Sequence, residues 1–362
     1  MTEVTYASAG VDTQAGDRAV ELMRDAVGRT FNSTVVGGFG GFAGMVDASA
    51  LRDMRKPLLT TSTDGVGTKI AIAQQMDIHH TIGQDLVAMV VDDIAVVGAR
   101  PLLMTDYIAC GKVEPTRIAN IVRGIAQACA QVDTPLLGGE TAEHPGVMSE
   151  DDYDIAGAAT GVVEADELLG ADRVREGDVV VAMASSGLHS NGFSLVRRVI
   201  EVSGAKLDTL VADFGRTLGE ELLEPTRLYS RDCLALKEQV GVGGLHALSH
   251  ITGGGLGANL ARVLPQHLAA QVRRDTWRVP PIFQWVQAAA NVPWEDLEST
   301  LNMGVGMVVI LSPEAAEIVL KKEDTWELGR ICKKGTDLGG RTISGTKGVE
   351  GGTVHLVGGY QL

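Results

Sequence analysis

The pattern of apolar and polar residues predicts three repeats of one order: a β-rich run, a glycine loop and a helix. In the first repeat, residues 58–63 are rich in strand-forming residues and deliver Asp64 to the loop 65–69, after which residues 70–76 have helical spacing. The three repeats comprise residues 57–76, 178–202 and 248–263. The spacing of apolar residues changes from a strand pattern to a helix pattern at each glycine loop. Each loop is therefore expected to lie between the end of a strand and the start of a helix.

The remaining pattern fills two blocks of mixed strands and helices. Further helices are expected over residues 19–27, 83–97 and 116–132, and further strands over 136–137, 155–163 and 308–311, while the glycine-rich tail after Gly335 has short β patches. The polar stretch 164–178 separates the blocks and predicts a boundary between domains 1–170 and 171–362. Mixed strands and helices indicate an α+β or α/β fold, and helical periodicity alone does not choose between them.

Length and composition exclude several classes of protein. A chain of 362 residues suggests two domains, and 45% hydrophobic with 21% charged residues is typical of a folded protein. The longest apolar runs are far shorter than the roughly 20 residues of a membrane span, and the N-terminus has no pattern of a secretory signal. The four cysteines form no CxxC pair, so we expect reduced thiols in a cytoplasmic protein.

The charge of the chain argues against nucleic acid as a partner. Acidic residues outnumber basic ones by 46 to 31, a net charge of −15, and no basic patch stands out. A phosphorylated small molecule remains possible, because Mg²⁺ and backbone N–H groups can supply the attraction.

The glycine clusters are the unusual feature, with 45 glycines against 11 prolines. A glycine loop before a helix exposes backbone N–H groups that can hold phosphate, although a tight turn is the simpler interpretation of any single loop. The loop 65–69 lacks the spacing of a Walker A motif, and residues 38–43 match a dinucleotide fingerprint only loosely.

Carboxylates lie close to these glycines. Asp85 and Asp92 are seven residues apart and share one edge of their helix, with Asp93 beside them. With Asp64, Glu140 and Glu143 they could supply the oxygen ligands that Mg²⁺ requires in a nucleotide site. The alternative is a solvated stripe on an amphipathic helix.

His189 lies between Gly187 and Asn191 at the end of a strand, where it could donate to a phosphate or act as a general acid or base. The alternative is an exposed loop histidine. The residues by themselves therefore indicate Mg²⁺-assisted phosphoryl transfer from a nucleotide to an acceptor that composition does not identify.

Six motifs occur together, in an order that is specific. They are residues 63–69, 138–143, 152–157, 185–192, 252–255 and 302–307. With them the chain, from Tyr6 to about Gly329, resembles the phosphoribosylformylglycinamidine cyclo-ligases of purine biosynthesis, also called aminoimidazole ribonucleotide synthetases. The resemblance implies an α+β fold of two mixed α/β-layer domains and a homodimer in which the N-terminal sheets pair into a barrel.

The resemblance implies an ATP-dependent ligase. Its substrate would be formylglycinamidine ribonucleotide, closed to aminoimidazole ribonucleotide with release of ADP and phosphate. Domain 1–170 would bind ATP and dimerise, and the glycine loops of domain 171–362 would complete the active site. Catalytic roles are implied for His189, Asp64 and Lys69, metal binding for Asp64, Asp92, Asp93 and Glu140, and nucleotide binding for Gly38, Gly40, Gly41, Gly65, Gly67, Thr68, Asn191, Thr252, Gly253 and Gly254.

The chain departs from the family pattern at three positions. The family often has Asn-Asp where this chain has Asp92-Asp93, Met where it has His144, and Cys where it has Met303. Two alternatives stay open: another small-molecule phosphotransferase of the same fold, such as a thiamine-phosphate kinase, or a non-catalytic nucleotide-sensing paralogue.

Overall fold

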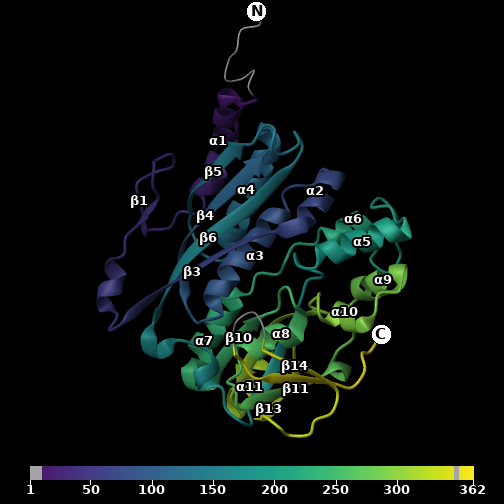
Figure 1. Cartoon of the computed structure of the whole chain (residues 1–362). Coiled ribbons are helices and arrows are strands. Elements are labelled where there is room, and N and C mark those ends of the chain that lie inside the picture. Colours follow the sequence, from purple (N-terminus) through teal and green to yellow (C-terminus); the bar gives the residue numbers. More distant parts are fainter. Residues whose placement is uncertain (1–9, 346–349) are drawn as a thin grey trace, which may run out of the picture. The chain divides into compact units, whose positions relative to one another are not determined.

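The computed structural model describes residues 10–345 and 350–362 of the chain. Residues 1–9, where the resemblance begins at Tyr6, and residues 346–349 lie outside the described part. The chain divides into two compact units (Figure 1): unit 1 comprises Met1–Ile94 and Ala99–Ala165, and unit 2 comprises Ala95–Gly98 and Asp166–Leu362.

Unit 1 is built on a four-stranded mixed sheet. Its strands, in spatial order, are β3 (Pro57–Gly65), β6 (Tyr153–Glu164), β4 (Arg100–Cys110) and β5 (Leu136–Glu143). The β3–β6 and β6–β4 pairs are antiparallel, whereas β4 and β5 are parallel and are connected through a helix, as a parallel pair requires.

Helices α3 (Ile82–Ala95) and α4 (Pro115–Gln131) run along this sheet (Figure 1). α4 begins where the Glu114 side chain accepts the free N–H groups of the first turn and a proline occupies the first helical position. A methyl group on Gly83 would collide with the backbone of α4, so glycine is needed where the two helices meet. Unit 1 also contains α1 (Thr13–Gly28) and α2 (Ile70–Met76).

The first glycine cluster is the loop of a small hairpin. Strands β1 (Val35–Val36) and β2 (Met45–Val46) pair antiparallel on either side of residues 37–44. Gly37 and Gly40 have positive φ angles of 91° and 95°, which side chains with a Cβ rarely adopt.

Unit 2 is built on a seven-stranded mixed sheet. Its strands, in spatial order, are β10 (Leu245–His250), β12 (Val305–Leu311), β7 (Val179–Ala184), β13 (Thr325–Lys333), β11 (Leu268–Arg273), β15 (Thr353–Val357) and β14 (Arg341–Ser344). In this sheet β11 and β15 pair in parallel, and the other strand pairs given for the described residues are antiparallel. The short strands β8 (Leu210–Val211) and β9 (Arg216–Thr217) form a separate hairpin.

Alternate residues of the central strands enter two different cores. Val180 and Ala182 of β7 pack with α8 (Gly255–Arg262), whereas Val179 and Val181 pack with α7 (Ser230–Gly244) and α11 (Pro313–Val319). The sheet is therefore covered on both faces, which explains why β7 and β12 are continuously apolar. The other helices of unit 2 are α5 (Phe193–Ser203), α6 (Leu218–Leu222), α9 (Pro281–Ala290) and α10 (Trp294–Glu298).

The three strand–loop–helix repeats are confirmed as β3 to α2, β7 to α5 and β10 to α8. Unit 1 differs from expectation in β1 and β2, which were not predicted, and in two larger features. The strand β4 was not predicted, and residues 138–143, expected as a glycine loop, continue strand β5. A methyl group on Gly139 would meet the side chain of Asp106 on β4, so this glycine serves close strand packing. No helix within the described residues is long and apolar enough to cross a membrane.

Candidate active site

The loop 185–192 of unit 2 holds His189 in a fixed and buried position. His189 is only 2% exposed and has a φ of 65°, so it is not an exposed loop histidine. Its Nε2 accepts the backbone N–H of Ser186 at 3.2 Å, which assigns the proton of the neutral ring to Nδ1. The loop is fixed from outside as well, because the Asn302 amide donates to the Gly187 carbonyl at 2.9 Å.

The imidazole of His189 lies in a small aromatic group. The Tyr229 ring lies 6.1 Å from His189 and 6.3 Å from His250, and its hydroxyl donates to the Ala184 carbonyl at 2.7 Å. A methyl group on Gly306 would lie 2.6 Å from Cε1 of His189 and closer still to the Tyr229 hydroxyl. Gly306 therefore gives the rings the space in which His189 sits.

The second loop of unit 2, residues 252–254, lies next to the first. A methyl group on Gly253 would be in ordinary contact, at 3.8 Å, with Nδ2 of Asn191. The buried Asn259 amide donates to the carbonyls of Thr252 and Gly255 at 3.1 and 2.9 Å, which fixes the shape of the turn before α8. The structure thus brings the predicted residues Asn191, Thr252, Gly253 and Gly254 together.

In unit 1, Asp64 lies exposed at the end of β3, where its Oδ1 accepts the N–H of Gly65 at 2.7 Å. Gly67 has a positive φ of 72°, and the exposed Thr68 follows it. Lys69 is fully buried, with Nζ 2.9 Å from both carboxylate oxygens of the equally buried Asp85. The structure therefore gives Lys69 an ion pair in the core of unit 1.

The other candidate metal ligands have different surroundings. Asp92 is fully buried on α3, while the adjacent Asp93 is exposed. Register aligns Asp64 with Gly157, Asp106 and Gly139 across the sheet, and Glu140 belongs to the next row. Because side chains alternate between faces, Glu140 and Asp64 belong to opposite faces and are not brought together.

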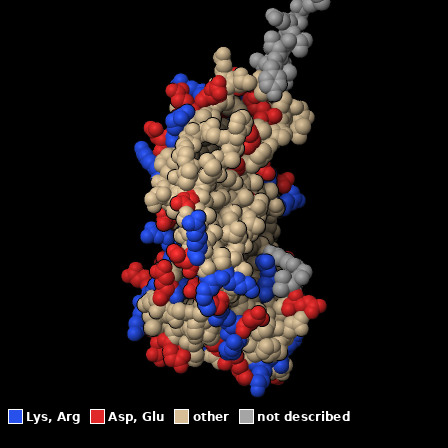
Figure 2. Space-filling model, turned by 90° about the vertical axis from the view of Figure 1, so that its left-hand side faces the viewer, with Lys and Arg blue, Asp and Glu red and all other residues tan. Residues whose placement is uncertain are grey.

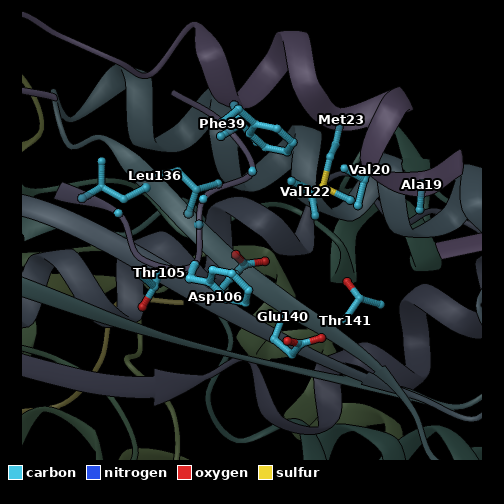
Figure 3. Close-up of a pocket in the computed structure, with 18 of the residues that line it drawn as sticks. Ala19, Val20, Met23, Phe39, Thr105, Asp106, Val122, Leu136, Glu140 and Thr141 are labelled. Atoms are coloured by element: carbon cyan, nitrogen blue, oxygen red, sulfur yellow. The ribbon is translucent and has the colours of Figure 1, made fainter. Parts of the chain in front are cut away.

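A pocket of about 560 Å³ lies in unit 1, a volume in the range of small-molecule sites. Figure 3 shows Phe39 of the glycine loop and Met23 and Val20 of α1 opposite Asp106 and Glu140 of the sheet. The predicted residues Gly40 and Gly41 also line it. Register gives Glu140 the face of the sheet opposite to that of Asp106, so Glu140 borders the pocket from the edge strand β5. An apolar wall with a carboxyl group suits a flat ring that carries polar substituents.

Asp106 is half-buried in this pocket, and its carboxyl lies over Gly139 of β5, where a methyl group would collide with it. Burial raises the pKa of its carboxyl to about 7, and a hydrogen bond from its own backbone N–H opposes the rise only in part. Near neutral pH the group can therefore donate as well as accept a hydrogen bond. Its strand β4 was not predicted, so sequence reasoning missed it.

Other site residues were also missed. Tyr229, Asn259 and Asp106 lie outside the loops that drew attention, whereas Asn302 and Gly306 belong to the motif 302–307 and received no role. The sequence could have pointed to Asn302 and Gly306, because they are the polar and glycine positions of that motif to which no role was given.

Within residues 10–345 and 350–362, no group of three or more His, Cys, Asp or Glu side chains is placed to hold a metal ion.

Two family models match most of the chain. The model described as "AIR synthase related protein, N-terminal domain" matches residues 46–163, and that described as "AIR synthase related protein, C-terminal domain" matches residues 175–338.

Curated relatives are similar over nearly their whole length. The chain is 46% identical to the phosphoribosylformylglycinamidine cyclo-ligase of Alkaliphilus oremlandii over 86% of this chain and 91% of the relative. It is 43% identical to the protein of the same name from Bacillus pumilus, over 94% of this chain and 99% of the relative.

Solved structures share the fold at low identity. The thiamine-monophosphate kinase of Stenotrophomonas maltophilia superposes with a TM-score of 0.62 at 20% identity, over 92% of this chain and 95% of that one. The hydrogenase maturation protein HypE in complex with ATP superposes with a TM-score of 0.60 at 18% identity, over 90% and 89%.

Proposed function

The chain belongs to the phosphoribosylformylglycinamidine cyclo-ligase family, and from this premise we propose that it closes formylglycinamidine ribonucleotide to aminoimidazole ribonucleotide at the expense of ATP. The observation that carries the proposal is 43% to 47% identity to relatives of this name, over most of both chains. A thiamine-phosphate kinase activity is not favoured, because it rests on a likeness of fold at 20% identity.

The chemistry explains the need for ATP. A formamide oxygen is a poor leaving group, so it first attacks the γ-phosphorus and ADP leaves. The neighbouring amidine nitrogen then attacks the formyl carbon, the carbon–oxygen bond breaks with release of phosphate, and the nitrogen loses a proton. Both centres belong to one molecule, so holding it in a reactive conformation supplies much of the acceleration.

For unit 2 we assign a phosphate-binding role to the two adjacent loops. The Nδ1 proton of His189 would donate to a phosphoryl oxygen, since Nε2 is engaged by Ser186. Asn191 and residues 252–254 would supply an amide and backbone N–H groups at the start of α8.

For unit 1 we assign the nucleotide to the loop 37–44 and the pocket that it borders. Phe39 and the apolar residues of α1 would cover the adenine ring, and Asp106 would meet its polar edge. Asp64 and the loop 65–68 would lie on the phosphate side. Lys69, buried with Asp85, would act by holding this loop against α3.

Mg²⁺ prefers oxygen ligands and is commonly held by one or two carboxylates together with substrate phosphates. We assign it to Asp64, which lies exposed at the end of β3, because the predicted ligand Asp92 is fully buried in α3 and Glu140 belongs to the opposite face of the sheet. When bound, Mg²⁺ would neutralise charge on the β- and γ-phosphates.

We further propose a cytoplasmic homodimer in which the sheets of unit 1 pair. Register places the exposed residues Leu59, Thr61 and Tyr107 on one face of the sheet. Figure 2, seen from the side where Figure 1 shows β1 and β3, has a broad region free of charged side chains in its upper half. Such a face is suited to association.

The test is product formation by the purified chain. Aminoimidazole ribonucleotide and ADP should form in equal amounts, and only when both ATP and Mg²⁺ are present. Thiamine phosphate in place of the ribonucleotide should give no ADP. Product without nucleotide, or turnover with thiamine phosphate alone, would contradict the proposal.

Asp64→Asn tests the assignment within unit 1. We expect kcat to fall at least about 100-fold because a metal or phosphate contact is lost. Asp154→Asn is the matched control: Asp154 lies on the neighbouring strand β6, and its Oδ1 likewise accepts the next N–H, from Ile155 at 2.9 Å. Equal rates in the two folded variants would leave Asp64 with a role in the turn alone.

A further inference from the structure

The C-terminal tail, defined as residues 339–345 and 350–362, follows the segment that the C-terminal family model matches. It adds β15 in parallel to β11, and β14 antiparallel to β15. The tail thus forms one side of the seven-stranded sheet of unit 2, where no role has been assigned to it.

The tail packs directly on α8, the helix that follows the loop 252–254. A methyl group on Gly257 of α8 would collide with the side chain of Ile343 on β14. At the other end of the helix, the N–H of Gly352 lies 3.1 Å from the Ala261 carbonyl and 2.9 Å from that of Leu264. The tail therefore contacts the helix near its start and satisfies carbonyl groups at its end.

An ion cluster joins the tail to the same loop from another side. The buried carboxylate of Glu298, at the end of α10, lies 2.7 Å from Arg274 and 3.0 Å from Arg341 of the tail. Arg341 also donates to Ser299 Oγ and to the Glu295 carbonyl, at 2.7 and 2.9 Å. Its guanidinium thus ties β14 to the end of α10 at several points.

The end of α10 lies against the glycine loop. A methyl group on Gly255 would collide with the backbone carbonyl of Glu298 and would come within 3.3 Å of that of Leu301. Gly255 has a φ of 70°, so its conformation and its close neighbour both require glycine. A displacement of Glu298 would therefore also displace the turn that precedes α8.

A second line of contacts runs from the tail toward the loop of His189. The Tyr360 ring lies edge-on to Trp277 at 5.6 Å, and the indole N–H of Trp277 donates to the Met303 carbonyl at 2.9 Å. Met303 follows Asn302, whose amide donates to Gly187. Both candidate phosphate loops of unit 2 thus rest on groups that the tail holds.

We propose that the C-terminal tail positions the phosphate-binding loops of unit 2, with Arg341 as its principal positioning residue. Arg341 acts through Glu298 and Gly255. The inference rests on the proposed function insofar as that function assigns a phosphate-binding role to residues 252–254.

The experiment compares Arg341→Ala, Arg341→Lys and the control Arg273→Ala in the full chain. Arg273 neighbours Arg274 but pairs with the exposed Asp275. Arg341→Ala should make peptides spanning residues 252–257 exchange amide hydrogen about 10-fold faster and raise the KM for ATP about 5- to 10-fold, with kcat within about twofold. Arg341→Lys keeps the charge without the planar fork and should recover part of both effects. Arg273→Ala should match the unaltered chain.

Unchanged exchange, or unchanged KM, in Arg341→Ala overturns the proposal, and so does an equal effect in Arg273→Ala. Should Arg341→Ala fail to fold, Arg341→Lys must still show the two changes in smaller degree. If the unaltered chain forms no product, the proposed function fails instead. Amide hydrogen exchange of residues 252–257 and calorimetric measurement of ATP binding would then still test whether the tail positions the loops.

Discussion

At the scale of single residues, the carboxyl of Asp106 couples the pocket of unit 1 to pH. Burial holds its pKa near 7, above the ordinary value of 3.8, so the folded chain retains a proton that the unfolded chain has already lost. Asp106 therefore lowers the stability of the fold progressively as pH rises from about 4 to 7, and no further above that.

We expect Asp106→Asn to raise Tm by about 4 °C at pH 8, roughly the effect of 1 to 2 kcal/mol in a domain of this size, and by little at pH 4. Calorimetry across this range measures the difference, with the exposed Asp53→Asn as control. A gain that does not depend on pH would mean that the amide acts through packing rather than through charge.

His189 belongs to the same scale. If its Nδ1 proton meets the phosphoryl group, His189→Ala should lower kcat/KM. The activation free energy should rise by about 2 to 4 kcal/mol, the cost of a lost transition-state donor. His267→Ala, at an exposed position of unit 2, is the control for steady-state kinetics. Equal kcat/KM in the two variants would return His189 to a structural role in its loop.

The residues of the candidate site could be predicted where a local sequence motif contains them, and not elsewhere. His189, Asn191 and residues 252–254 lie in glycine loops, and the structure places Asn191 beside Gly253. Tyr229 reaches His189 from a segment 40 residues further along the chain, with no periodic signal. Burial is equally non-local: Asp92 and Asp93 are neighbours in sequence, yet one is buried and the other exposed.

At the scale of elements, Gly306 shows how strand β12 makes room for a functional ring. Gly306→Ala would push a methyl group into the Tyr229 hydroxyl and His189, so we expect a loss of about 1 to 3 kcal/mol in stability together with lower kcat/KM. Gly243→Ala is the control, because nothing lies within 4 Å of a methyl group there.

Tyr229→Phe removes the atom nearest to that methyl group. The double variant Gly306→Ala/Tyr229→Phe should therefore lose less stability in denaturant unfolding than the two single changes added together. Strict additivity would show that Gly306 is needed for a reason other than this contact.

The elements of unit 1 were predicted unevenly for a physical reason. α3 is apolar along most of its length and α4 has an apolar face, whereas β5 contains Gly138 and Gly139, which on local grounds indicate a turn. Only the approach of Asp106 from β4 explains why β5 tolerates glycine. Whether such a segment forms a strand depends on the neighbouring strand, and local β-propensity does not predict it.

At the scale of the whole molecule, sheet order could not be predicted, because pairs such as β7 with β13 join segments more than 140 residues apart. The apolar face of the unit 1 sheet leads to a prediction here. Leu59→Asp should convert the proposed dimer to a monomer in light scattering coupled to size-exclusion chromatography, since a charge would be buried without a partner.

Val202→Asp is the control for that experiment, because Val202 is similarly exposed, at 59% against 67% for Leu59, but lies on α5 of unit 2. A monomeric unaltered chain, or a dimer that survives Leu59→Asp, would remove the unit 1 face from consideration as the interface.

The position of β15 between β11 and β14 also has a consequence for synthesis on the ribosome. All four strands of the unit 1 sheet are available once Glu164 has emerged, but the seven-stranded sheet lacks an interior strand until Thr353–Val357 has been added. Nascent unit 2 therefore carries β11 as an open edge, the kind of surface that recruits other chains. A message cut short before Thr353 would leave this edge permanently open, and its product should be a target for chaperones and proteases rather than a slightly shorter enzyme.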